Sequence, residues 1–147
     1  MDIRSRTVFL ALILAQAAHS IEEYALRLFD VFAPARFISG LLTSNLARGF
    51  AIANISVVLF GAWCYVARVR PGRPSARAVA WSWAVVELAN GIGHSLLALA
   101  TGGYFPGAAT APLLIGISVY LIMRLSAAPA PAPHCTSSAL TTGRLWR

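Results

Sequence analysis

The segment AHSIEEYALRLFD, residues 18–30, places a histidine and two glutamates close together in an otherwise apolar stretch. If the stretch is helical, His19, Glu22 and Glu23 occupy positions i, i+3 and i+4 and share one face. The chain has only five acidic residues, and Glu22 and Glu23 are two of them. An ionised carboxylate in apolar surroundings is costly unless it is paired, protonated or bound to a metal. These three residues are therefore the first candidates for chemistry.

A second polar group lies in the segment WSWAVVELANGIGHSLLALA. Glu87, the only other glutamate, is followed by Asn90 and His94 at helical positions i+3 and i+7, again on one face. Histidine and glutamate are the ligand types with which helical bundles bind zinc, iron or manganese. We therefore predict a divalent metal site with five candidate ligands, namely His19, Glu22, Glu23, Glu87 and His94.

The same residues suggest roles in a reaction. Whichever of the three glutamates does not bind the metal could act as the general base on a metal-activated water. Asn54 and Asn90 would orient substrate or bound water, and Thr110 would reach the same polar layer from the last helix. Such a site suits the hydrolysis or isomerisation of a lipophilic small molecule reached from the bilayer, and the sequence does not choose between the two reactions.

Two other functions use the same side chains. Buried glutamate and histidine also form proton relays, so a small proton- or cation-coupled transporter is an alternative, and a chain of this length would then need to form a homo-oligomer. A structural membrane subunit with a buried polar network is the second alternative. Metal content separates the enzyme from both.

Four apolar blocks must position these residues. Each approaches the roughly 20 residues that a membrane-spanning helix needs, and they cover about residues 7–28, 48–67, 78–100 and 106–123. We expect an all-α, four-span transmembrane bundle over residues 1–125. The Pro-, Ala-, Ser- and Thr-rich residues 126–147 predict a disordered tail. In this arrangement the polar groups of the first three spans meet at one level in the outer half of the bilayer.

The composition supports a membrane protein. Hydrophobic residues make up 58% of the chain and charged residues 12%, against about 25% in soluble domains. The net charge of +7 comes from twelve arginines and no lysine, and these arginines flank apolar blocks instead of forming a basic face. This distribution gives no support to nucleic-acid binding. Nine of the arginines fall on one side of a four-span topology, which predicts a multi-pass protein of the bacterial plasma membrane, surrounded by lipid, with both termini cytoplasmic.

Three local interpretations depend on this topology. The first block also resembles a secretory signal that would be cleaved after Ala17. Pro106 is expected to begin the fourth helix at a tolerated first-turn position, with Pro112 kinking that helix inside its first turn. Gly91 and Gly93 are expected to allow close approach of a neighbouring helix.

The ordered set of motifs resembles a known family. His19-Ser-Ile-Glu22-Glu23 near the start of a short four-span chain is similar to the HXXEE family of small bacterial and archaeal membrane proteins. Asn90-Gly-Ile-Gly-His94 and Pro106-Gly107-Ala-Ala-Thr110 resemble that family's Asn-x-x-x-His and Pro-Gly-x-x-Thr segments. The resemblance covers about residues 7–123. It implies an integral membrane protein whose polar motif residues form an active site, and it argues against cleavage two residues before His19.

Overall fold

The structure of the protein, a computed structural model, describes residues 1–127, and this part of the chain is entirely helical apart from its turns. The elements are α1 (Ile3–Ala25), α2 (Leu28–Val31), α3 (Ala33–Leu42), α4 (Leu46–Cys64), the π-helical turn η1 (Tyr65–Val69), α5 (Ala76–Thr101) and α6 (Ala111–Ala127). The prediction of an all-α fold is confirmed for this part. Apart from Ser126 and Ala127, which end α6, the predicted tail lies outside the described residues.

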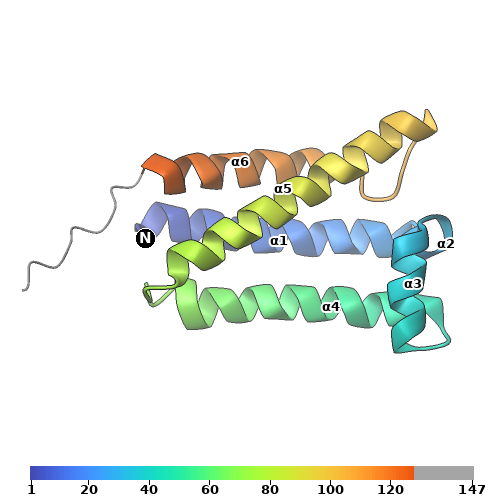
Figure 1. The fold of residues 1–147 in the computed structure, drawn as a ribbon, viewed down its shortest axis with the longest axis horizontal. Helices are drawn as coiled ribbons and strands as arrows, with labels where there is room; N and C mark the ends of the chain where they lie inside the picture. The colour runs from blue at the N-terminus through green and yellow to red at the C-terminus, as the bar shows by residue number, and fades with distance from the viewer. Residues whose placement is uncertain (128–147) are drawn as a thin grey trace, which may run out of the picture.

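Four long helices run back and forth along one axis (Figure 1). α1 and α4 lie side by side, α5 crosses them obliquely, and α6 returns beside α1, while α3 lies across the far end of the pair α1 and α4. Two helices are long and apolar enough to cross a membrane, judged by length and composition: Leu46–Val69, which joins α4 to η1, and Ala76–Thr101. That α1 and α6 also cross a membrane stays a prediction.

Local sequence signals set the helix ends. The Asp2 side chain caps α1 by accepting a hydrogen bond from the Ser5 backbone N–H at 3.1 Å, and Asn45 caps α4 through the Arg48 N–H at 3.0 Å. α5 ends at Gly102, whose φ of 65° lies in the left-handed region that glycine adopts without strain. Each of the three signals can be read from the residue type alone.

The fourth helix begins later than expected. The prediction that Pro106 starts it is wrong, because residues 106–110 form turns and α6 begins at Ala111. Pro112 is consequently the second residue of α6, a first-turn position where a missing N–H costs no helical hydrogen bond and no kink is needed. Gly107 in this turn has a φ of 93°, whereas residues of an α-helix have a φ of about −63°.

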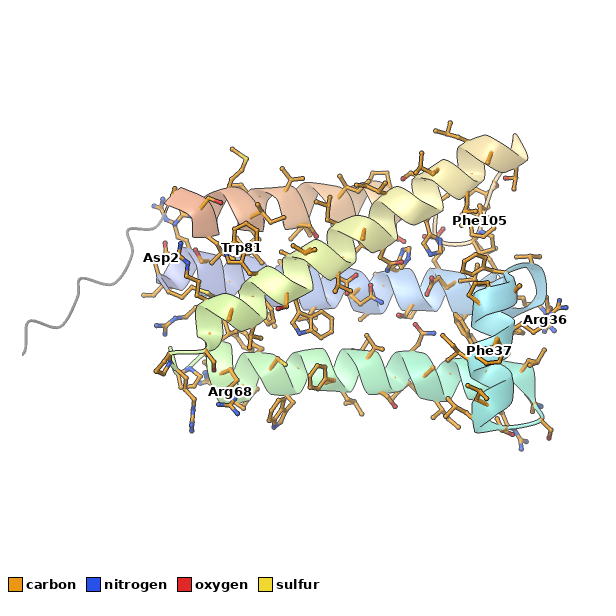
Figure 2. The ribbon with its side chains drawn as sticks, in the orientation of Figure 1. Asp2, Arg36, Phe37, Arg68, Trp81 and Phe105 are labelled. Carbon is orange, nitrogen blue, oxygen red and sulfur yellow. The ribbon has the colours of Figure 1, made fainter. Side chains whose placement is uncertain are left out.

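The core consists of two apolar clusters with a polar layer between them along α1. One cluster includes Phe9, Leu12 and Leu114, and the other includes Phe29 and Phe105. The two clusters lie toward opposite ends of the bundle, as the labels of Trp81, packed on the first, and Phe105 show (Figure 2). Four buried polar residues of α1 lie between them in sequence, namely Gln16, His19, Ser20 and Glu23, and a fifth, Ser5, lies near the start of the helix.

Candidate metal centre

Three buried side chains from α1 and α5 converge in the polar layer. One carboxylate oxygen of Glu23, Oε1, lies 3.4 Å from Nε2 of His19 and 3.0 Å from Nε2 of His94. The imidazole rings stand edge to face, with centroids 4.7 Å apart. His19 is 0% exposed, and Glu23 and His94 are each 6% exposed. Helical spacing places His19 and Glu23 one turn apart on α1, and α5 brings His94 from across the bundle.

The hydrogen bonds of Thr110 determine which nitrogen of His19 carries the proton. The Thr110 hydroxyl has one hydrogen, and it donates this hydrogen to Oε2 of Glu22 at 2.6 Å. The same hydroxyl lies 2.7 Å from Nδ1 of His19 and must accept a hydrogen bond there. His19 therefore carries its proton on Nδ1, and Nε2 of the neutral ring is a free lone pair.

His94 is fixed in the same way. Its Nδ1 lies 2.6 Å from the carbonyl oxygen of Pro106, and a carbonyl can only accept. The free lone pair of the neutral ring is again on Nε2. When both rings are neutral, two Nε2 lone pairs and the Glu23 carboxylate thus face one another with no hydrogen between them, and Nε2 of His19 makes no hydrogen bond to any described residue. A cation at this point, either a metal ion or a proton shared among the rings and the carboxylate, satisfies this set of acceptors.

The spacing of these atoms fits a transition-metal ion. Tetrahedral zinc with bond lengths near 2.0 Å holds its ligand atoms about 3.3 Å apart. One ligand atom from each of His19, Glu23 and His94 can be chosen so that all lie within 4.8 Å of one another, and the two distances to Glu23 are 3.0 and 3.4 Å. Three protein ligands leave the fourth coordination position open. Catalytic zinc sites have this arrangement, whereas structural zinc sites have four protein ligands. Each imidazole also has the outward Nδ1 hydrogen bond that metal-binding histidines make.

Glu22 points to a different partner, the turn between α5 and α6. Its carboxylate accepts hydrogen bonds from the backbone N–H groups of Gly107, Ala109 and Thr110 at 3.1, 3.0 and 2.9 Å, as well as from the Thr110 hydroxyl. The hydroxyl of Tyr104 donates a further hydrogen bond to it. This bond to a carboxylate raises the pKa of Tyr104 above its ordinary value of 10.0, which keeps the phenol protonated as a donor.

Glu87 is 2% exposed and lies two turns before His94 on α5. The amide of Asn90 is its hydrogen-bond donor, at 3.5 Å, and also donates to Oε1 of Gln16 at 3.4 Å. Gln16 in turn donates to the Ser20 hydroxyl at 3.2 Å, and Ser20 donates to Oδ1 of Asn54 at 2.7 Å. A line of hydrogen bonds therefore crosses the bundle from α5 through α1 to α4.

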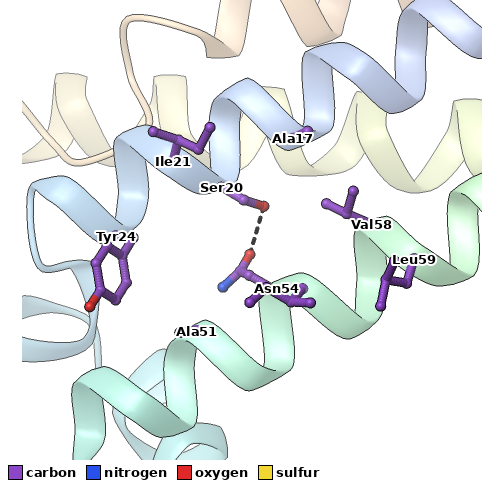
Figure 3. A pocket seen from close by; sticks show the side chains of 9 residues that line it. Ala17, Ser20, Ile21, Tyr24, Ala51, Asn54, Val58 and Leu59 are labelled. Carbon is purple, nitrogen blue, oxygen red and sulfur yellow. Dashed lines mark hydrogen bonds between the residues drawn. The ribbon is translucent and has the colours of Figure 1, made fainter.

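The Ser20–Asn54 end of this line opens into a groove between α1 and α4 (Figure 3). The groove has a volume of about 390 Å³, and Ser20 and Asn54 meet within it. Apart from these two residues and Tyr24, its lining is aliphatic, namely Ala17, Ile21, Ala51, Ile55, Val58 and Leu59. Apolar walls with one polar pair suit a lipophilic ligand that carries a small polar group.

The structure brings together three of the five predicted ligands: His19, Glu23 and His94. Glu22 and Glu87 have other partners, because Glu22 accepts hydrogen bonds from the turn before α6 and Glu87 accepts one from Asn90. Of the predicted substrate-binding residues, Asn90 contacts Glu87, Asn54 lines the groove, and Thr110 contacts His19.

Sequence reasoning assigned no role at the site to Gln16, Tyr104 or Gly107, although Gly107 belongs to the Pro-Gly-x-x-Thr segment of the family resemblance. Gln16 lies three residues before His19 and so shares its helix face, which is a signal that could have found it. For Gly107 that segment was the available signal, and it did not show the contacts of Gly107, because these depend on how the turn folds back over the two imidazoles. A Cβ atom on Gly107 would lie 2.7 Å from Cε1 of His19 and 2.8 Å from Cε1 of His94.

Fold and site together define the class: a small all-helical bundle with two helices of membrane-spanning length and a buried His–Glu–His cluster suited to a metal ion. The family model HXXEE, described as a protein of unknown function with HXXEE motif, matches residues 10–121, and the chain belongs to this family. The resemblance seen in the sequence is thereby confirmed. No curated protein and no solved structure matches the chain. Within the motif, His19 and Glu23 face the centre, while Glu22 faces the turn.

Proposed function

We propose that the protein is a metal-dependent enzyme embedded in a membrane, with α1, α4, α5 and α6 as four spans and both termini in the cytoplasm. The outer surface of the bundle supports the membrane location. Only 17% of the most apolar stretch of Leu46–Val69 is buried inside the bundle. For Ala76–Thr101 the buried share is 22%. Apolar surface of this extent outside a bundle requires lipid or a protein partner to cover it.

The observation that supports a metal is the set of three acceptors at the centre. Nε2 of His19, Nε2 of His94 and Oε1 of Glu23 face one another, and each ring's Nδ1 is already engaged on its far side. Zinc, iron and manganese all accept this combination of ligands. When bound, such an ion would lower the pKa of a coordinated water toward 7.

The remaining polar residues supply the other parts of the proposed site. Glu87 is buried, lies outside the ligand set and has Asn90 as its hydrogen-bond donor, so it is our candidate for the general base. The groove beside Asn54 would bind the apolar part of a lipophilic substrate. The reaction class that these groups suit is hydrolysis or isomerisation.

Elemental analysis of the full-length protein, purified in detergent after growth with zinc, iron and manganese, tests this proposal. Wild type should retain stoichiometric metal, and His19→Ala, Glu23→Gln and His94→Ala should each lose it, because two ligands hold an ion poorly. Asn54→Ala is the matched control, since Asn54 lies in the groove, and it should retain the metal.

Two results would contradict the proposed enzymatic function, and each would favour one of the alternative functions. A metal-free wild type that moves protons in proteoliposomes, with transport lost in Glu23→Gln, would show that the centre binds a proton and that the protein is a transporter. A metal-free protein without transport, in which Glu23→Gln changes only the free energy of unfolding, would show that the polar layer is structural.

A further inference from the structure

The adjacent glutamates of the HXXEE motif perform different tasks because successive helix residues point about 100° apart. Glu23 points at the two imidazoles, and Glu22 points at the turn between α5 and α6. Five donors reach the Glu22 carboxylate. Oε1 accepts from Tyr104 Oη, Gly107 N and Ala109 N, and Oε2 accepts from the N and Oγ1 of Thr110.

These bonds leave Glu22 no free capacity to bind a metal. A carboxylate has about four lone-pair sites, and five donors already converge on this one. A metal ion at Glu22 would require the turn to be released. The position of Glu22 is therefore explained by the turn that it holds.

The turn, in contrast, contacts both histidines of the candidate ligand set. The hydroxyl of Thr110 accepts from Nδ1 of His19 at 2.7 Å, and the carbonyl of Pro106 accepts from Nδ1 of His94 at 2.6 Å. Gly107 lies between Pro106 and Thr110 in the sequence. It packs directly on the imidazole rings of His19 and His94, which leave no space for a side chain. One short segment thus determines the proton position and the orientation of both imidazoles.

We propose that Glu22 is a positioning residue for the metal centre: it binds the turn of residues 104–110, and through Thr110 and Pro106 that turn directs Nε2 of both histidines at Glu23. This inference rests on the proposed metal centre. It explains why the motif needs two consecutive carboxylates, because one is a ligand and the other holds the segment that orients the remaining ligands.

Zinc titration of the detergent-purified full-length protein provides the first test. Loss of an outer hydrogen-bond partner typically weakens metal binding 10- to 100-fold. We expect Glu22→Gln and Thr110→Val to weaken zinc binding by about this factor, with the saturating stoichiometry unchanged. Thr110→Ser, which retains the hydroxyl, should bind zinc like wild type. Thr7→Val is the control, because it makes the same substitution at an exposed residue of α1 whose hydroxyl donates to the carbonyl of Ile3.

The second test does not require metal. In protein labelled with ¹⁵N-histidine, the ring nitrogens of His19 should report protonation on Nδ1 in wild type and in Thr110→Ser. Thr110→Val should show a mixture of tautomers, because its side chain no longer accepts from Nδ1. This measurement also covers the case in which Glu22→Gln fails to fold.

The outcomes distinguish this inference from the proposed function. A wild type that binds no metal overturns the proposed enzyme, and the tautomer of His19 in Thr110→Val then decides the positioning role by itself. Equal zinc affinity and an unchanged tautomer in Thr110→Val would overturn the positioning role while leaving the metal centre intact. Loss of stoichiometric zinc in Glu22→Gln with normal binding in Thr110→Val would make Glu22 a ligand, which also overturns it.

Discussion

Among the residues of the polar layer, the three glutamates differ in how their charge is compensated. Glu23 lies between two imidazoles, Glu22 accepts five hydrogen bonds from one turn, and Glu87 has only the long bond from Asn90 among the described residues. A buried carboxylate with one weak donor is poorly stabilised as an anion. Glu87 is thus the residue most readily available to exchange a proton, in keeping with the role of general base proposed for it.

Gly107 provides a residue-scale prediction. Gly107→Ala should lower the free energy of unfolding by about 1–3 kcal/mol, because φ is 93° and the new methyl group would press on both imidazoles. It should also weaken zinc binding by displacing the rings. Thermal unfolding and zinc titration in detergent measure the two effects. Gly103→Ala, with no atom within 4 Å of the added Cβ, is the matched control and should have little effect on either. Equal stability of the two variants would contradict the close packing of the turn on the rings.

Helical spacing was enough to predict some of these residues and not others. His19, Glu23 and His94 were predicted because ionisable side chains in apolar helices are conspicuous and share a face. The same reasoning put Glu22 in the ligand set, since spacing alone does not show that a distant turn surrounds it with donors. Gln16 lies on the same face of the helix, but it was not predicted because it stands outside the His–Glu–Glu segment.

At the level of the elements, the contact between α5 and α6 depends on one of two nearby glycines. A Cβ on Gly91 would lie 2.8 Å from Cγ1 of Ile115 and 2.9 Å from the carbonyl oxygen of Ala111, whereas a Cβ on Gly93 would meet nothing within 4 Å. The prediction that both glycines allow close helix approach is thus confirmed for Gly91 and wrong for Gly93.

This contrast gives a prediction with its control in the same helix. Gly91→Ala should destabilise the bundle by about 1–3 kcal/mol, because the added methyl forces α5 and α6 apart. Gly93→Ala should be neutral or stabilising by up to about 1 kcal/mol, since alanine favours a helix over glycine. Unfolding in increasing SDS, followed by circular dichroism, measures both. A Gly93→Ala variant as unstable as Gly91→Ala would show that α5 packs on α6 through a different face.

The lengths of the long helices could be predicted from the apolar blocks, and the connections could not. The first three blocks correspond to α1, to α4 with η1, and to α5, with ends shifted by a few residues. The fourth helix starts at Ala111 because the backbone N–H groups of Gly107, Ala109 and Thr110 bond to Glu22. A helix starting at Pro106 would bond the N–H groups of Ala109 and Thr110 to the carbonyls of Phe105 and Pro106, and so take them away from the carboxylate. That competition is tertiary, so the propensity of Pro106 could not reveal it.

Across the whole molecule, polar contacts join α1, α5, α6 and the turn after η1 at one end of the bundle. Arg6 donates to the carbonyl of Arg70 at 2.8 Å, and Arg77 donates to the carbonyl of Leu125 at 2.7 Å. Asp2 and Arg124 form an ion pair there. Hydrogen bonding to Ser5, with a smaller contribution from the Arg124 guanidinium, lowers the pKa of Asp2 below its ordinary value of 3.8. The start of α1 and the end of α6 are thus held at the same end, opposite α3 (Figure 1).

Labelling from the two sides of the membrane tests the proposed topology. In a chain carrying Cys64→Ala and Cys135→Ala, Ser44→Cys places a thiol between α3 and α4, and Arg73→Cys places one between η1 and α5, both at exposed positions. The two connections lie at opposite ends of the bundle. With the arginine-rich end in the cytoplasm, an impermeant maleimide should modify Ser44→Cys on intact cells and Arg73→Cys only after lysis. Labelling of both on intact cells, or of neither, would contradict four spans in this orientation, because opposite ends of a spanning bundle cannot face the same compartment.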